Sequence, residues 1–154
     1  MDVTIAGRPA GAAERRLWER AKAAAALAYA PYSGLRVGAA LATVAGATFS
    51  GVNVENAAYP VGLCAERAAL AAAVSAGERR FAALAVATDS GAPILPCGAC
   101  LQALAEFGEI EVVVRAPAAE SAARGEPAGE LAELRVVALG ELLRAPFRGP
   151  SAVP

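Results

Sequence analysis

The residues of this chain best suited to chemistry are its three cysteines, Cys64, Cys97 and Cys100, and the glutamate at position 66, Glu66. Cys97 and Cys100 lie three positions apart at the predicted start of a helix, so both thiols face the same side of that helix. Cys64 opens another predicted helix. The positive end of a helix dipole lowers the pKa of a nearby thiol, so two helix starts directed at one point favour thiolates. Three thiolates around Zn²⁺ leave the fourth tetrahedral position open, as in catalytic zinc sites.

Two charged residues follow Cys64 directly in the string LCAERAAL. Glu66 is not needed as a metal ligand, and a free carboxylate beside a zinc-activated water can act as a proton shuttle. Three thiolates leave the zinc site with a net negative charge, which would raise the pKa of that water. A guanidinium that donates to the sulfurs withdraws part of the charge. We therefore predict Glu66 as the catalytic acid and base, and Arg67 as a residue that supports the zinc ligands.

Each of these residues also has a plain structural interpretation. Cys64 could be a small buried hydrophobic residue, and PCGAC (96–100) could be a thioredoxin-like redox pair. Glu66 and Arg67 could merely complement the helix dipole or stay solvated. However, CAE and PCGAC occur about thirty residues apart, and each follows a predicted strand and opens a predicted helix. This joint pattern favours the metal site.

The composition excludes several classes of function. The chain has no histidine, so it contains no Ser-His or Cys-His catalytic pair, and a metal site must use cysteine or carboxylate ligands. Its 14 Lys and Arg against 15 Asp and Glu leave no surplus of cations for binding nucleic acid. We expect no membrane span and no secretion signal, because no apolar run is long enough and the first residues lack a basic segment. An odd number of cysteines fits reduced thiols in a cytoplasmic protein.

Helices and strands that alternate along the chain must bring these residues together. The sequence predicts a helix at 12–29, a β-hairpin of 36–44 and 47–55, a helix at 64–76, a strand at 81–88, a helix at 97–107, strands at 110–116 and 133–139, and a helical turn at 140–147. Five strands interleaved with helices indicate an α/β fold, a three-layer α/β/α sandwich with a five-stranded mixed sheet. We expect a single domain over 1–154, with a core of about 12–147, a surface loop at 117–132 and a frayed tail at 148–154.

Most of the chain resembles the small, homotetrameric cytidine deaminases. Zinc deaminases of this kind pair a Cys-x-Glu or His-x-Glu string with Pro-Cys-x-x-Cys and use the glutamate as acid and base. The similarity runs in order through AYAPYSG (28–34), VGAAL, NVENAAYP, LCAERAAL, AVAT and PCGAC to ELLRAPF (141–147). It implies zinc-dependent hydrolysis of cytidine and 2′-deoxycytidine to uridine and 2′-deoxyuridine, a pyrimidine salvage reaction that releases ammonia. It also implies one zinc per chain and a homotetramer without nucleic-acid or membrane partners.

The resemblance implies three substrate contacts within one subunit, besides zinc ligation by the cysteines and proton transfer by Glu66. Asn53 and Glu55 would bind the ribose 3′-hydroxyl, and the Ala65 backbone N–H would meet the pyrimidine O2. An amide and a carboxylate at alternate strand positions point the same way and can hold one hydroxyl as donor and acceptor. Without the resemblance, both would be interpreted as polar residues at a strand end.

Three further residues would act between subunits. Ala57 and Tyr59 would lie near the sugar of a neighbouring subunit's ligand, and a neighbour's Phe147 would stack on the base, which would make the oligomer obligatory for activity. Two residues depart from the family pattern. Leu35 stands where an aromatic residue usually lines the base pocket, and Leu101 follows the last ligand where arginine is common.

Two other functions fit parts of the pattern. A deaminase of a modified cytosine nucleoside, such as a nucleoside antibiotic, would share CAE and PCxxC, but the string NVENAAY (53–59) favours an ordinary ribose. The alternative from another class is a non-catalytic zinc or redox module. Metal content and thiol titration distinguish these, since one zinc and no freely reactive thiols favour the enzyme.

Overall fold

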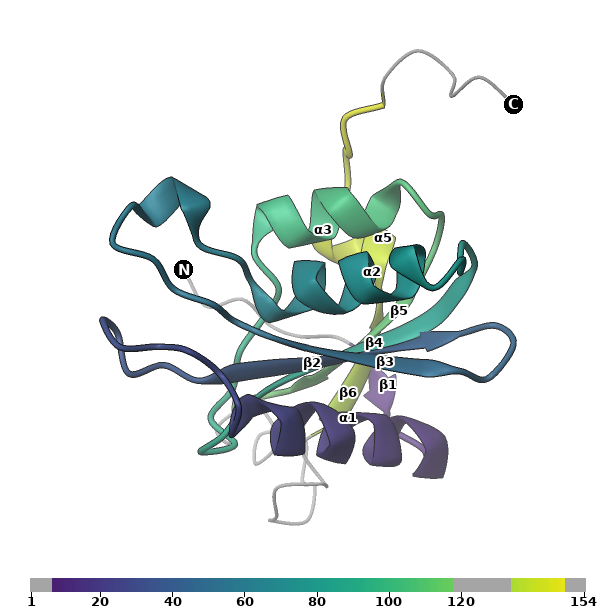
Figure 1. The fold of residues 1–154 in the computed structure, drawn as a ribbon. Coiled ribbons are helices and arrows are strands. Elements are labelled where there is room, and N and C mark those ends of the chain that lie inside the picture. The colour runs from purple at the N-terminus through teal and green to yellow at the C-terminus, as the bar shows by residue number, and fades with distance from the viewer. Residues whose placement is uncertain (1–6, 118–133, 149–154) are drawn as a thin grey trace.

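The computed structural model describes residues 7–117 and 134–148, so the predicted loop at 117–132 and tail at 148–154 lie almost wholly outside the described residues. A mixed sheet lies between two helical layers (Figure 1). Helix α1 (Ala12–Ala25) covers one face of the sheet. The other face is covered by α2 (Ala65–Ser75), α3 (Gly98–Ala105) and α5 (Leu139–Leu142). The predicted three-layer α/β/α sandwich is confirmed.

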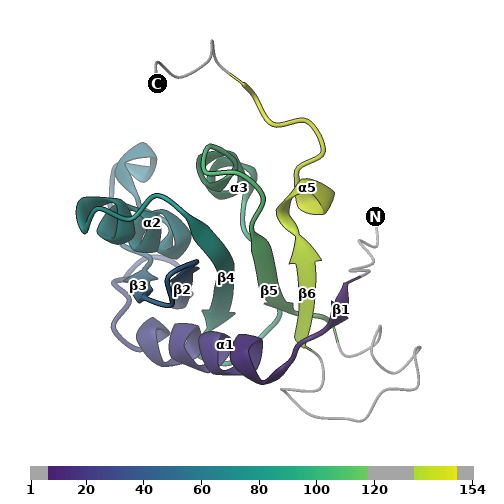
Figure 2. The same cartoon turned by 90° about the vertical axis from the view of Figure 1, so that its right-hand side faces the viewer.

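Within the described residues, the sheet has six strands in the order β1-β6-β5-β4-β2-β3. Their bounds are β1 Arg8–Pro9, β2 Val37–Thr43, β3 Thr48–Val52, β4 Phe81–Thr88, β5 Glu111–Arg115 and β6 Leu134–Ala138. Among these six strands, β4 and β5 pair in parallel and the other neighbours are antiparallel, so the sheet is mixed as predicted (Figure 2). The five predicted strands are present. The sixth, β1, was missed because two residues carry no alternating pattern.

Helix α1 ends at Ala25, four residues before its predicted end at Tyr29. The chain leaves the helix because Tyr29 pairs instead with the end of the β-hairpin. Its N–H donates to Asn53 O at 3.1 Å, and its carbonyl accepts from Glu55 N–H at 2.8 Å. Helix propensity in the alanine-rich stretch thus gives way to a non-local pairing that places the 30–35 segment beside residues 53–55.

Close packing of α2 on the sheet depends on a glycine in β3. A Cβ added at Gly51 would lie 2.2 Å from Ala69 N and 2.4 Å from Ala65 O, both in the backbone of α2. Such distances are shorter than any real contact, so only glycine lets this helix lie so near the strand. Because Cys64 and Glu66 stand at the start of α2, Gly51 also sets their height above the sheet.

Apolar side chains fill both faces of the sheet. The larger cluster, beneath α2, α3 and α5, includes Leu41, Leu84, Leu101, Leu104 and Val112, and the smaller one, over α1, includes Leu17, Trp18, Val113 and Leu134. Of the residues described, 7–117 and 134–148, none belongs to a helix long and apolar enough to cross a membrane.

Candidate metal centre and adjoining cleft

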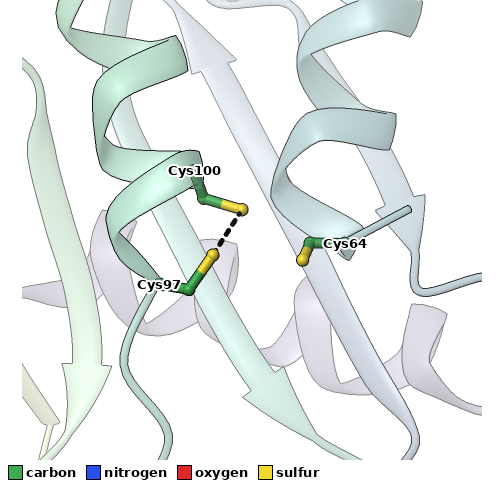
Figure 3. Close-up of side chains that lie close together, drawn as sticks. All are labelled: Cys64, Cys97 and Cys100. Carbon is green, nitrogen blue, oxygen red and sulfur yellow. Dashed lines mark hydrogen bonds between the residues drawn. The ribbon is translucent and has the colours of Figure 1, made fainter. Parts of the chain in front are cut away.

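The three cysteines come together between the starts of α2 and α3 (Figure 3). Cys64 is the N-cap of α2, Cys97 is the N-cap of α3, and Cys100 lies in the first turn of α3. Their sulfurs all lie within 4.8 Å of one another, and the Cys97 and Cys100 sulfurs are 3.5 Å apart. A disulfide needs about 2.05 Å, whereas Zn–S bonds of about 2.3 Å in a tetrahedron separate two sulfurs by about 3.8 Å. The cluster therefore fits a zinc ion and not a disulfide.

The surroundings act differently on the two thiols of α3. Burial opposes ionisation of Cys97, but hydrogen bonds with the backbone N–H and thiol of Cys100, the backbone N–H of Ala99 and the thiol of Cys64 together outweigh burial and lower its pKa. Burial, together with the nearby Glu66 carboxylate, raises the pKa of the Cys100 thiol. Three sulfurs and a carboxylate crowded in this way repel one another when charged, and a bound cation removes that repulsion.

Glu66 is 5% exposed, at the second position of α2. Burial raises the pKa of its carboxyl, while its own backbone N–H, the Cys100 thiol and the Arg67 charge oppose that rise. A carboxyl group whose pKa is raised holds a proton more firmly between two transfers, which suits an acid and base beside a metal site. Its position is therefore suited to the acid and base role predicted from the sequence.

Arg67 lies beside the sulfurs. Its Nη2 donates to Cys64 Sγ at 3.9 Å and to Gly62 O at 3.4 Å. The hydrogen bond with Cys64, followed by the contacts with Cys100, raises the pKa of the guanidinium. Its Nε is buried and has no hydrogen-bond partner among the described residues. The guanidinium is thus placed where it can withdraw charge from the thiolates.

A cleft of about 680 Å³ adjoins the cysteines. Four segments line it, 32–37, 53–56, 59–67 and 94–97, and Cys64, Glu66 and Cys97 are among the lining residues. Sites for small organic ligands have volumes of about 300–1,000 Å³. The cleft is therefore large enough for a molecule of nucleoside size next to the proposed metal.

Asn53 and Glu55 line this cleft, and their polar atoms already contact the backbone opposite. Asn53 accepts from Val37 N–H at 2.8 Å and donates to Leu35 O at 2.9 Å. The Glu55 carboxylate accepts from Tyr32 N–H at 2.8 Å, from Ser33 N–H at 3.2 Å and from the Ser33 hydroxyl. That hydroxyl, ahead of the N–H groups, lowers the pKa of Glu55.

Of the other predicted contacts, only Ala65 is expected to act in the chain's own cleft, because the remaining three are expected to act on a neighbouring subunit's ligand. Ala65 lines the cleft, and its N–H, as the first of α2, has no acceptor within the helix. Tyr59 lines it with 80% of its surface exposed. Ala57 is exposed and does not line the cleft, and neither does Phe147, which is 77% exposed and bonded through its backbone to Gln102.

The two residues that depart from the family pattern lie in different environments. Leu35 is 49% exposed and lines the cleft, whereas Leu101 is 6% exposed and packs in the core beneath α2 and α3. Sequence reasoning missed two residues with specific contacts here, Ser33 and Gln102. Each acts on a residue far along the chain, so no local pattern could have revealed it.

Comparison with known proteins agrees with this geometry. Residues 12–116 match the family described as "Cytidine and deoxycytidylate deaminase zinc-binding region". A cytidine deaminase from Sporosarcina psychrophila is 50% identical over 92 residues, 60% of this chain and 68% of that protein. One from Halalkalibacterium halodurans is 42% identical over 120 residues, 78% of this chain and 83% of that protein. The solved cytidine deaminase from Burkholderia pseudomallei is 45% identical with a TM-score of 0.71, covering 86% of this chain and 97% of that chain.

Proposed function

The chain belongs to the family of zinc-binding cytidine and deoxycytidylate deaminases, and we propose that it hydrolyses cytidine and 2′-deoxycytidine to uridine and 2′-deoxyuridine with release of ammonia. One observation carries this function. Three cysteine sulfurs lie within 4.8 Å of one another, and two of these cysteines, Cys64 and Cys97, line a cleft of nucleoside size together with the buried Glu66. Three protein ligands with a free carboxylate beside them are typical of catalytic zinc, because the fourth position stays open.

Cys64, Cys97 and Cys100 would hold one zinc ion per chain. When bound, zinc supplies a Lewis acid that lowers the pKa of a water molecule. The water can then lose a proton at neutral pH and become a nucleophile that attacks carbon. Arg67 supports this chemistry, since its guanidinium lies 3.9 Å from Cys64 Sγ and offsets part of the thiolate charge. The helix starts of α2 and α3 favour the charged sulfurs in the same way.

Glu66 carries the protons of the reaction. It takes one proton from the attacking water and gives it to N3 of the cytosine ring. As the water oxygen bonds to C4 of the ring, Glu66 takes the remaining proton from that oxygen and gives it to the amine. The C4–N bond then breaks, and the nucleoside and water have become uridine and ammonia. Burial, which raises the pKa of Glu66, favours a carboxyl that keeps each proton until the next transfer. The Ala65 N–H, free of helix acceptors, would orient the base through its O2.

We also propose that the protein acts as a homotetramer with shared active sites, in cytoplasmic pyrimidine salvage. The support for the oligomer is a group of large apolar side chains that line the cleft and are nevertheless exposed: Tyr32, Leu35, Val54, Tyr59, Leu63 and Leu95. A concentration of this kind marks an interaction surface. A neighbour's Phe147, 77% exposed in one chain, would then cover the base.

A direct assay tests the reaction. Cytidine absorbance should fall with stoichiometric formation of uridine and ammonia, a zinc chelator should abolish this turnover, and added zinc should restore it. Zinc-loaded protein that produces no uridine would exclude the function. The same assay with a cytosine-containing nucleoside antibiotic tests the modified-nucleoside alternative, which requires the antibiotic to be the better substrate.

A further inference from the structure

The end of the β-hairpin is bound to one wall of the cleft by a set of hydrogen bonds. Glu55 accepts two backbone N–H groups and a hydroxyl from Tyr32 and Ser33. Asn53 holds the backbone on the far side, at Leu35 O and Val37 N–H. Two side chains therefore fix both ends of the segment 32–37, which lines the cleft.

Ser33 links these contacts at the centre of the segment. Its hydroxyl donates to Glu55 Oε1 and accepts from Leu35 N–H at 2.9 Å. A serine hydroxyl has one proton and two lone pairs, so it can serve both neighbours at once. The Ser33 hydroxyl thus couples the Glu55 carboxylate to the backbone of Leu35, which lines the cleft.

Burial contributes little to holding residues 32–35, although Val37 at the end of the segment is buried in the core. Tyr32 is 56% exposed and Leu35 is 49% exposed. Between them Gly34 adopts a φ of 70°, a left-handed conformation that turns the chain back on itself. Hydrogen bonds rather than apolar packing must therefore determine where the Leu35 side chain lies.

We propose that Ser33 is a positioning residue for substrate binding, whose hydroxyl holds the segment 32–37 as a fixed wall against which the nucleoside binds. Leu35 offers the ligand a smaller surface than an aromatic ring would, so its contact with the base depends on how well its backbone is placed. The role of the wall in nucleoside binding rests on the proposed deaminase function. The coupling of Ser33 to the segment does not.

Amide hydrogen exchange tests the coupling without any substrate. In zinc-loaded Ser33→Ala, the amides of 33–37 should exchange about tenfold faster than in the wild type, while those of β4 stay unchanged. Ser33→Thr keeps a hydroxyl and should restore slow exchange. Ser75→Ala, at the exposed end of α2, is the matched control and should change neither region. Unchanged exchange at 33–37 in Ser33→Ala would overturn the proposal.

Kinetics test the consequence for binding. Ser33→Ala should raise the KM for cytidine about fivefold and leave kcat within about twofold. The inhibition constant of 2′,3′-dideoxycytidine should rise by the same factor, because the wall contacts the base whether or not the sugar carries hydroxyls. An effect confined to cytidine would overturn the proposal, since Ser33 would then act only on the sugar hydroxyl through Glu55. A wild type inactive on cytidine would refute the deaminase function and leave the exchange result to decide the coupling.

Discussion

The side-chain amide of Gln102 brackets the backbone of Phe147. Its Nε2 donates to Phe147 O at 2.8 Å, and its Oε1 accepts from Phe147 N–H at 2.8 Å. Gln102 stands two residues after Cys100 on α3, so the helix that carries two of the proposed zinc ligands also fixes the C-terminal segment. The backbone of Phe147 is held while the residue stays 77% exposed, an arrangement that favours contact of its ring with another subunit.

Gln102→Leu should therefore release Phe147 and weaken substrate binding. We expect a rise in KM of about tenfold with zinc per chain unchanged, because neither residue is one of the three cysteines proposed to hold the ion. Phe147→Ala should cause a similar rise. The double variant should be no worse than Phe147→Ala alone, since both changes remove one interaction. Additive effects of the two substitutions on KM would contradict the coupling.

Replacing the proposed proton carrier tests the centre of the mechanism. Glu66→Gln preserves size and polarity but cannot take a proton, so kcat should fall about 10²–10⁴-fold. Zinc per chain and the melting temperature should stay close to those of the wild type, because the amide fits the same buried position. Near-normal turnover with the glutamine would exclude Glu66 as the acid and base.

Removal of a proposed ligand should change metal content before anything else. Cys97→Ala leaves only Cys64 and Cys100 to hold the ion, so zinc per chain after dialysis should fall well below one. Thiol titration gives the complementary result. Wild-type thiols should be unreactive when zinc is bound and become reactive after chelation. Unchanged zinc content in Cys97→Ala would mean that Cys97 is not a ligand.

The sequence could predict the candidate metal centre because its signals are local. Cys64 and Glu66 share one helix start, Cys97 and Cys100 share another, and each helix is the next α-helix after a strand. Their convergence then follows from the layered α/β architecture, which the strand and helix patterns also predict. For the three cysteines and Glu66 to converge, one long-range feature is needed as well: both helices must begin at the same end of the sheet.

What the sequence could not predict depends on pairs of residues far apart in the chain. Ser33 meets Glu55 across 22 positions, and Gln102 meets Phe147 across 45. The early end of α1 has the same origin, since Tyr29 pairs with the hairpin. Helix or strand propensity and hydrophobic periodicity describe each segment by itself. Contacts between residues that only the fold brings together therefore cannot be recognised from these local patterns.

The close packing of α2 on Gly51 leads to a prediction about the stability of the fold. Gly51→Ala would force a methyl group to within 2.4 Å of backbone atoms of Ala65 and Ala69, so the helix must move away from the sheet. Overpacking of this kind costs about 1–3 kcal/mol, and we expect the free energy of unfolding to fall by about 3 kcal/mol. Gly98→Ala is the matched control, because an added Cβ there meets nothing within 4 Å. Equal melting temperatures for the two variants would show that α2 does not need the glycine.

The pKa of Glu55 predicts how the cleft wall responds to acid. The Ser33 hydroxyl, ahead of the backbone N–H groups of Tyr32 and Ser33, lowers this pKa in the folded protein. Because the folded value lies below the unfolded one, the carboxylate contributes stability above the unfolded pKa, and this contribution is lost as the pH falls through the folded value. The wall should therefore stay ordered at pH values where an ordinary glutamate is already partly protonated. Ser33→Ala should raise the pKa of Glu55, so the segment 32–37 of this variant should loosen at a higher pH than that of the wild type. NMR titration of the Glu55 side-chain carboxyl carbon measures this pKa. A Glu55 titration that is identical in the two proteins would show that the hydroxyl does not stabilise the carboxylate.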